Sequence, residues 1–233
     1  MVDEEKEKEK IQDENGILNK NYKIEYIIEK YSRDLIDYKV IIVGYNGIGK
    51  GKIASLLFNK VYDDSYPPTR DFDISFYQIK IQNEIIQINF WYIIDWLSIF
   101  NLYNKVSLAI IVYSTDDRSS LKNIGYLCNR INEHSFDCIK FLVGNNTRSE
   151  EFREVPKLNE ERYNQYYGFD LLMEVSSETG YNIENLKKNI IYYLYEKRLK
   201  EKEDDLLFED ALNKIRKNKK KKNNIFNLSY NSK

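Results

Sequence analysis

The stretch Val40-Ile-Ile-Val-Gly44-Tyr-Asn-Gly47-Ile-Gly49-Lys50-Gly51 decides the fold. Its apolar half is typical of a buried strand, and its glycine-rich half is typical of a loop that opens a helix. The loop reads G-x-x-x-x-G-K-G, a pattern in which glycines let the backbone wrap around a phosphate while the lysine reaches the terminal phosphates. By itself, the stretch is equally compatible with a plain strand-turn-helix joint. If it holds phosphate, the expected binding residues are Gly44, Gly47, Gly49, Lys50, Gly51 and Lys52.

The last position of this loop departs from the usual motif. Ser or Thr normally follows the lysine, and its hydroxyl binds Mg²⁺. Gly51 stands there instead and has no side-chain hydroxyl to offer. The loop therefore predicts phosphate binding without one of the usual magnesium ligands.

Around this stretch, short apolar runs alternate with longer segments of helical periodicity. Such alternation predicts an α/β fold with a mostly parallel sheet of six strands, flanked by about five helices. The Gln82-Asn83-Glu84 segment predicts a hairpin turn between the second and third strands. The predicted strands cover residues 39–43, 74–81, 85–91, 108–113, 139–143 and 171–175. The predicted helices cover residues 50–58, 97–103, 118–132, 159–166 and 182–199.

The two ends of the chain have a different composition from the centre. Residues 1–20 are charged and predict a flexible arm. In residues 21–37, isoleucines recur at three- and four-residue spacing, which predicts a helical extension. The α/β domain is then expected over residues 38–200, followed by a charged helical or disordered tail over residues 201–233. The basic block Lys217-Asn-Lys-Lys-Lys-Lys222 in that tail is either solvated, a weak contact for anionic membranes, or a nuclear address.

Composition excludes several classes of protein. The 36 Lys and Arg balance 37 Asp and Glu, so no overall field attracts nucleic acid. Cys128 and Cys138 are the only cysteines and are expected to pack in the core, which argues against a disulfide scaffold. No apolar stretch is long enough to span a bilayer, and no lipidation motif is present at either end. We expect a cytoplasmic protein, with peripheral membrane contact limited to an unlipidated tail.

Four further segments follow the glycine-rich loop in a fixed order. Thr69 stands nineteen residues beyond Lys50, and Ala109-Ile-Ile-Val-Tyr113 precedes a polar turn. Phe141-Leu-Val-Gly-Asn145 and Glu174-Val-Ser-Ser-Glu-Thr-Gly180 come next. With these segments, the chain from Tyr38 to about Leu194 resembles the Ras superfamily of small GTPases, the Rab and Rho types especially. The resemblance implies a P-loop NTPase small-G-domain fold, GTP and GDP as ligands, a switch I threonine at Thr69, and base-side residues at Asn145, Ser176 and Ser177.

The resemblance fails at the positions that bind magnesium and activate water. Trp91 matches the tryptophan of the family's W-D-T-A-G-Q segment. Tyr92 then replaces the magnesium-shell aspartate, Asp95 replaces the glycine at the γ-phosphate, and Trp96 replaces the catalytic glutamine. Because an indole cannot orient a water for in-line attack, we expect no catalytic residue here and GTP hydrolysis that is impaired or absent. Mg²⁺ would have Thr69 at most as a protein ligand.

The guanine-reading segment is also altered. After Asn145, the family's lysine becomes Asn146 and its aspartate becomes Arg148. That aspartate accepts two hydrogen bonds from guanine, whereas arginine only donates. We expect guanine binding to be weakened by about 10²–10⁴-fold.

These substitutions leave three hypotheses for function. The first is a pseudo-GTPase that keeps the fold as an interaction, signalling or trafficking scaffold and binds protein effectors or scaffold partners through the switch I and switch II face. The second is a divergent but working GTP-binding Rab-like switch in intracellular vesicle transport. The third is an adaptor that uses the basic tail. Under the first hypothesis, the aromatic residues of switch II either fill the nucleotide cleft or bind a partner.

Overall fold

The computed structural model describes residues 24–27, 36–58, 72–81, 84–93, 100–146, 150–156 and 158–230. Within them, one mixed sheet has the strand order β1-β3-β4-β2-β5-β6-β7. The strands from β4 to β7 in this order are parallel, and β3 is antiparallel to β4, with Ile81 opposite Glu84 as a hairpin requires. The strands are β1 (Ile24–Ile27), β2 (Ile36–Gly44), β3 (Phe72–Ile81), β4 (Glu84–Ile93), β5 (Leu108–Ser114), β6 (Ile139–Asn145) and β7 (Leu171–Val175). The α/β fold and all six predicted strands are confirmed.

The first strand corrects one prediction. A helix was expected over residues 21–37, but Ile24–Ile27 form β1, which pairs antiparallel with β3, and β2 begins at Ile36. The helical spacing misled because isoleucines three and four apart also occur in β-branched strand sequences. The open edge of β3 supplies the hydrogen-bond partners that make the extended form favourable. The remaining residues of the predicted helix and the 1–20 arm lie outside the described residues.

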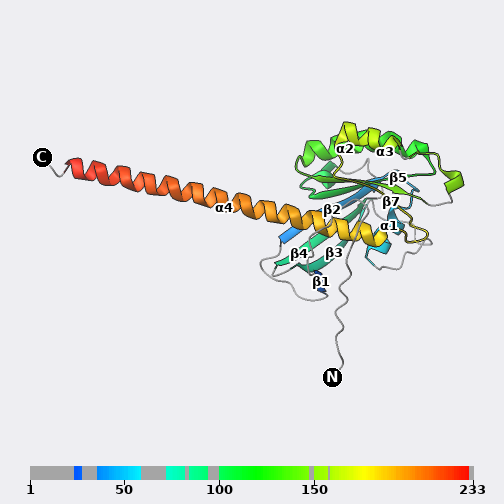
Figure 1. Ribbon diagram of the computed structural model, residues 1–233, viewed down its shortest axis with the longest axis horizontal. Helices are drawn as coiled ribbons and strands as arrows, with labels where there is room; N and C mark the ends of the chain where they lie inside the picture. Colours follow the sequence, from blue (N-terminus) through cyan, green and yellow to red (C-terminus); the bar gives the residue numbers. More distant parts are fainter. Residues whose placement is uncertain are drawn as a thin grey trace, which may run out of the picture.

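Helices cover both faces of the sheet (Figure 1). On one face α1 and α4 bury residues such as Ile53 and Leu186 against β2 and β5. On the other face α2 and η1 pack residues such as Leu127 and Tyr103 against the opposite side chains of the same strands, and α3 packs there too. Central strands buried on both faces read as continuous apolar runs, which is why they were visible in the sequence. The helices are α1 (Lys50–Leu57), α2 (Ile124–His134), α3 (Leu158–Tyr167) and α4 (Ile183–Tyr230), with 3₁₀ turns η1 (Phe100–Tyr103), η2 (Arg118–Asn123) and η3 (Glu150–Phe152).

The predicted helix over residues 118–132 begins as a 3₁₀ turn. Asp117 accepts a hydrogen bond from the Ser119 N–H and caps η2, after which α2 runs from Ile124. The short helix predicted over residues 97–103 is the 3₁₀ turn η1, and residues 94–99 lie outside the described part of the chain. Both cysteines are buried, as predicted.

The last helix is much longer than predicted. A helix was expected over residues 182–199, followed by a helical or disordered tail. Instead α4 continues to Tyr230 as one helix of 48 residues, about 72 Å at 1.5 Å per residue. No Gly or Pro interrupts it. Its first part is fixed to the sheet, where the Tyr38 hydroxyl donates to Glu201 at 2.7 Å and Lys202 pairs with Glu84 at 2.8 Å. The remainder projects away from the domain (Figure 1).

Candidate functional site

The glycine-rich loop lies at the carboxyl end of β2 and leads directly into α1. Gly47 and Gly49 both adopt left-handed backbone angles, with φ of 79° and 81°. Gly49 is the N-cap of α1, and its carbonyl accepts the Ile53 N–H at 3.0 Å. The loop thus turns the chain through two conformations that favour glycine and places the positive end of a helix at its close. This geometry suits an anion at the N-terminus of α1.

Lys50 is folded into this loop. Its ammonium donates to the carbonyl of Gly44 at 2.9 Å and to the carbonyl of Tyr45 at 2.6 Å, and its side chain is buried. Burial lowers the pKa of Lys50 from its ordinary value of 10.5 to about 8. A partly desolvated ammonium at the N-terminus of α1 is the arrangement that a phosphate would stabilise, because an anion beside it favours the charged form. The residues present therefore fit a phosphate group.

Asn145 joins three segments that are far apart in the sequence. Its Nδ2 donates to the carbonyl of Ile48 at 2.8 Å and to Ser177 Oγ at 3.0 Å, while its Oδ1 accepts the Ser177 N–H at 2.9 Å. Both amide hydrogens are therefore engaged by the protein. We call this arrangement of Ile48, Asn145 and Ser177 the asparagine clamp. The sequence assigned Asn145 to the base side of the site, and the structure places it between the phosphate loop and the loop after β7.

The loop after β7 completes that side of the site. Ser176 is buried; its N–H donates to the Tyr181 carbonyl at 3.0 Å, and its hydroxyl accepts the Thr179 N–H at 3.3 Å. Lys52, which the sequence grouped with the phosphate-binding residues, forms an ion pair with Glu178 at 2.7 Å. The phosphate loop and the predicted base-side serines thus lie close together through Asn145 and Lys52.

The other side of the loop borders a small cavity of about 140 Å³. Tyr92 lies there on β4, paired with Ile42 of β2 and Asp73 of β3. Mg²⁺ prefers a near-octahedral shell of hard oxygen ligands, and neither the glycine nor the phenol of this cavity provides the usual hydroxyl and carboxylate. Gly51 and Tyr92 therefore do not fit the Mg²⁺ coordination by a hydroxyl and a carboxylate that the resemblance implied. The cavity is lined by Gly51, Ala54, Ser55, Phe58, Asp73, Ser75, Phe90 and Tyr92.

Among the described residues of this lining, Asp73 alone carries a carboxylate, and no sequence motif pointed to it. Its Oδ1 accepts the N–H of Ile74 at 2.8 Å. Its place could have been found from the two-residue period of β3, which puts Asp73 and Ser75 on one face. Among the side chains that the structure describes, no three carboxylate, histidine or cysteine groups gather as a metal site would need.

Four of the predicted site positions, Thr69, Asp95, Trp96 and Arg148, lie outside the described residues. Asn146 lies inside them, just after β6, where its N–H donates to the Val175 carbonyl at 2.8 Å.

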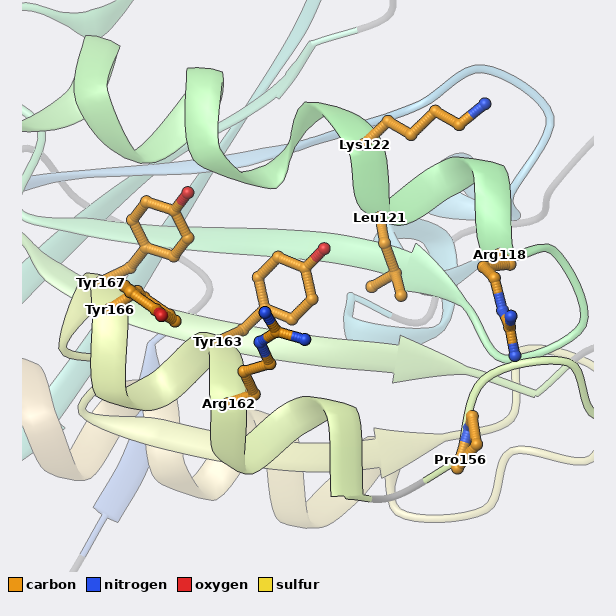
Figure 2. Close-up of a pocket in the computed structure, with 8 residues that line it drawn as sticks. All are labelled: Arg118, Leu121, Lys122, Pro156, Arg162, Tyr163, Tyr166 and Tyr167. Carbon is orange, nitrogen blue, oxygen red and sulfur yellow. The ribbon is translucent and has the colours of Figure 1, made fainter.

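A larger hollow of about 550 Å³ opens between η2 and α3 (Figure 2). It shares no residue with the phosphate loop or with the small cavity. The Arg118 guanidinium at its rim donates to the Glu154 carbonyl at 3.1 Å. No sequence pattern predicted this hollow, because its two walls come together only in the folded chain. It is lined by Arg118, Leu121, Lys122, Pro156, Arg162, Tyr163, Tyr166 and Tyr167.

A mostly parallel sheet with a glycine-rich loop between β2 and α1 defines a P-loop α/β protein. The Ras family model matches residues 39–196, so the chain belongs to the Ras family. It is 26% identical over 167 residues to the Ras-related protein RABE1d of Arabidopsis thaliana, covering 68% of this chain and 77% of that protein. It is also 26% identical to the Ras-related protein RABC1 of Arabidopsis thaliana over 166 residues (68% and 77%) and to the Ras-related protein RAB1BV of Beta vulgaris over 154 residues (64% and 71%).

Two properties are general in the Ras family. Ras-family proteins typically bind GTP and GDP, and they generally act by binding protein effectors. No helix in the described part of the chain is long and apolar enough to cross a bilayer.

Proposed function

We propose that this chain is a Ras-family pseudo-GTPase, which binds nucleotide weakly or not at all and acts as an interaction scaffold in signalling or trafficking. The observation that carries the proposal is that Gly51 and Tyr92 line the same small cavity, at the two positions where the family has a hydroxyl and a carboxylate. Without these two oxygens, Mg²⁺ has lost its usual protein ligands on this side of the phosphates. Of the three positions that bind Mg²⁺ in the family, only Thr69 keeps a suitable side chain.

The base side supports the same proposal. Both amide hydrogens of Asn145 are engaged within the asparagine clamp, so guanine recognition falls on the residues that follow it. Those positions hold Asn146 and Arg148, which offer no carboxylate to the guanine N1 and N2 groups. Each lost charge-assisted hydrogen bond weakens binding by about 1.5–3 kcal/mol. Nucleotide binding is therefore expected to be weak and to discriminate poorly between purines.

In addition to weak nucleotide binding, we expect GTP hydrolysis to be impaired or absent. The family's mechanism requires a side chain that orients the attacking water, and Trp96 stands at that position. The chain then keeps one shape instead of cycling between two nucleotide states. A fixed shape suits a scaffold whose partners bind the switch I and switch II face.

The test is an equilibrium titration with fluorescent GTP, GDP and ATP, each in Mg²⁺ and in EDTA. We expect micromolar or weaker affinity, little preference between guanine and adenine, and no gain from Mg²⁺. Submicromolar GTP affinity that depends on Mg²⁺ would overturn the proposal. Lys50→Ala serves as the control, because any binding through the phosphate loop should fall with it.

The second candidate is a divergent but working Rab-like switch in vesicle transport. The carboxylate of Asp73 in the cavity beside Gly51 favours it, because that carboxylate could take over part of the magnesium shell. Under this candidate, Asp73→Asn lowers GTP affinity at least tenfold in Mg²⁺ and leaves it unchanged in EDTA. Under the pseudo-GTPase proposal, Asp73→Asn changes neither value.

A further inference from the structure

The projecting part of α4 carries large apolar side chains that remain exposed. The helix makes its last described contacts with the domain at Glu201 and Lys202. A helix of this length gains most of its stability by packing an apolar face against another element. Within the described side chains, no such element covers residues 203–217. Four of the large apolar side chains there are between 53% and 70% exposed: Leu206, Leu207, Phe208 and Ile215. Leu212, in the same segment, is partly buried.

Three of the apolar residues form one stripe. Phe208, Leu212 and Ile215 follow one another at spacings of four and three, which places them on the same helix face. This is the repeat of a seam between two helices. The stripe is short, so its partner must bring complementary features beyond apolar contact.

The charges on either side of the stripe supply those features. Residues 203–210 contain five acidic residues and no basic one. Residues 214–222 contain seven basic residues and no acidic one. The two blocks lie on opposite sides of Leu212, so the helix carries an acidic segment and a basic segment separated by one helical turn.

We propose that two copies of the chain associate through antiparallel α4 helices, with the two-fold axis near Leu212. In this arrangement, each residue lies at the level of the residue equally far on the other side of Leu212. Position 210, an aspartate, then lies level with the lysine at position 214 of the second copy. Position 205 lies level with position 219, and position 203 with position 221, so that acid again meets base. Each copy contributes the same surface, as a closed two-fold dimer requires.

The charges exclude the parallel alternative. Two parallel helices in register would place acid against acid over residues 203–210 and base against base over residues 214–222, which is unfavourable. The antiparallel register also brings the stripe together, since Phe208 of one copy lies next to Ile215 of the other while the two Leu212 side chains meet at the axis. Charge and apolar pattern therefore select the same register.

Disulfide trapping tests the register directly. Cys128 and Cys138 are buried, so a cysteine introduced on α4 is the reactive one. In the full chain, Leu212→Cys should form a disulfide-linked dimer under mild oxidation, because the two positions meet at the axis. Phe208→Cys is the matched control on the same stripe, and its two copies are separated by about 12 Å along the helices, beyond disulfide reach. We expect at least tenfold faster cross-linking for Leu212→Cys.

A mixture of Phe208→Cys and Ile215→Cys chains should cross-link faster than either chain alone. Equal rates for Leu212→Cys and Phe208→Cys would contradict the antiparallel register. A wild-type chain that remains monomeric at about 100 µM in low salt by sedimentation would overturn the dimer itself.

Charge reversal gives a second measurement. Replacing Lys219, Lys220 and Lys221 by Glu should weaken the dimer at least tenfold, and mixing that variant with one carrying Lys at positions 203–205 should restore association. If the reversal leaves the dimer unchanged, the charge argument is wrong. A wild-type monomer that sediments with phosphatidylserine vesicles would assign the helix to a membrane surface and would also overturn the proposal.

Discussion

The two sides of the phosphate loop differ in what holds them. On the side of Asn145, three buried hydrogen bonds tie Ile48 and Ser177 together. On the side of Tyr92, the loop borders a cavity of about 140 Å³. The hydrogen bonds of the first side contribute to stability whether or not a nucleotide binds, whereas the second side is where the pseudo-GTPase proposal expects the magnesium ligands to be missing. A retained glycine-rich loop is therefore weak evidence for GTP binding in this chain.

Substitutions at Gly47 and Gly49 distinguish the contribution of the asparagine clamp to stability from that of backbone strain. A Cβ at Gly49 would lie 2.4 Å from Asn145 Nδ2, whereas a Cβ at Gly47 would meet nothing within 4 Å. Both have positive φ, so both substitutions carry the same backbone strain. Gly49→Ala should destabilise the fold by about 4 kcal/mol, from strain and the broken clamp. Gly47→Ala should cost about 1 kcal/mol from strain alone. Urea unfolding measures both, and equal costs would show that the clamp does not depend on Gly49.

The buried ammonium of Lys50 in the phosphate loop should make the free energy of unfolding depend on pH. Its pKa is lowered from 10.5 to about 8, so the folded state releases the proton before the unfolded state does. This contribution to stability therefore rises between pH 8 and pH 10.5, by about 3 kcal/mol in total. The Lys50→Met substitution removes this pH-dependent contribution, because methionine does not titrate. The unfolding free energy of the wild type relative to Lys50→Met should increase across this range, and parallel curves would contradict the buried charge.

Returning the family's two magnesium-binding groups to the cavity beside Tyr92 tests the other side of the loop. Gly51→Ser together with Tyr92→Asp returns a hydroxyl and a carboxylate to the cavity. We expect GTP affinity to rise by about tenfold in Mg²⁺, which corresponds to about 1.4 kcal/mol, and not in EDTA. Gly51→Ala with Tyr92→Asn is the matched control without the added magnesium ligands. A gain shared by both double variants would point to relief of steric bulk and not to metal binding.

The smallest effect is expected at the ion pair between Lys52 and Glu178. The side chains are 32% and 49% exposed, and solvent screens such pairs. Lys52→Ala should therefore change the free energy of unfolding by less than about 1 kcal/mol. If the phosphate loop binds anions through Lys50, Lys52→Ala should also leave nucleotide affinity within about twofold. A loss as large as that of Lys50→Ala would make Lys52 a phosphate ligand in its own right.

The sequence predicted the centre of the fold well. The six strands were found because each is a short apolar run, and β7 was predicted at its observed bounds. The loop from Gly44 to Lys50 was found because glycines at this spacing, directly after an apolar strand, are typical of a phosphate loop. The order of the motifs assigned Asn145 and Ser177 to the base side of the site, but it did not predict their hydrogen bonds to each other and to the phosphate loop.

The ends of the fold were harder to predict. At β1, four residues are too few for a period to distinguish strand from helix, and the free edge of β3 decided the outcome. For α4, the change in composition at residue 200 suggested a boundary, although nothing in the sequence stops a helix there. The engagement of both Asn145 amide hydrogens and the place of Asp73 beside Gly51 depend on contacts between distant segments, which no local pattern contains.

The most direct test is the nucleotide content of the purified full-length protein. Denaturation followed by chromatography of the released small molecules measures it without any assumption about affinity. The pseudo-GTPase proposal predicts less than about 0.1 mole of GDP or GTP per mole of protein, because a ligand bound at micromolar strength is lost during purification. One mole of guanine nucleotide per mole of protein would contradict the account.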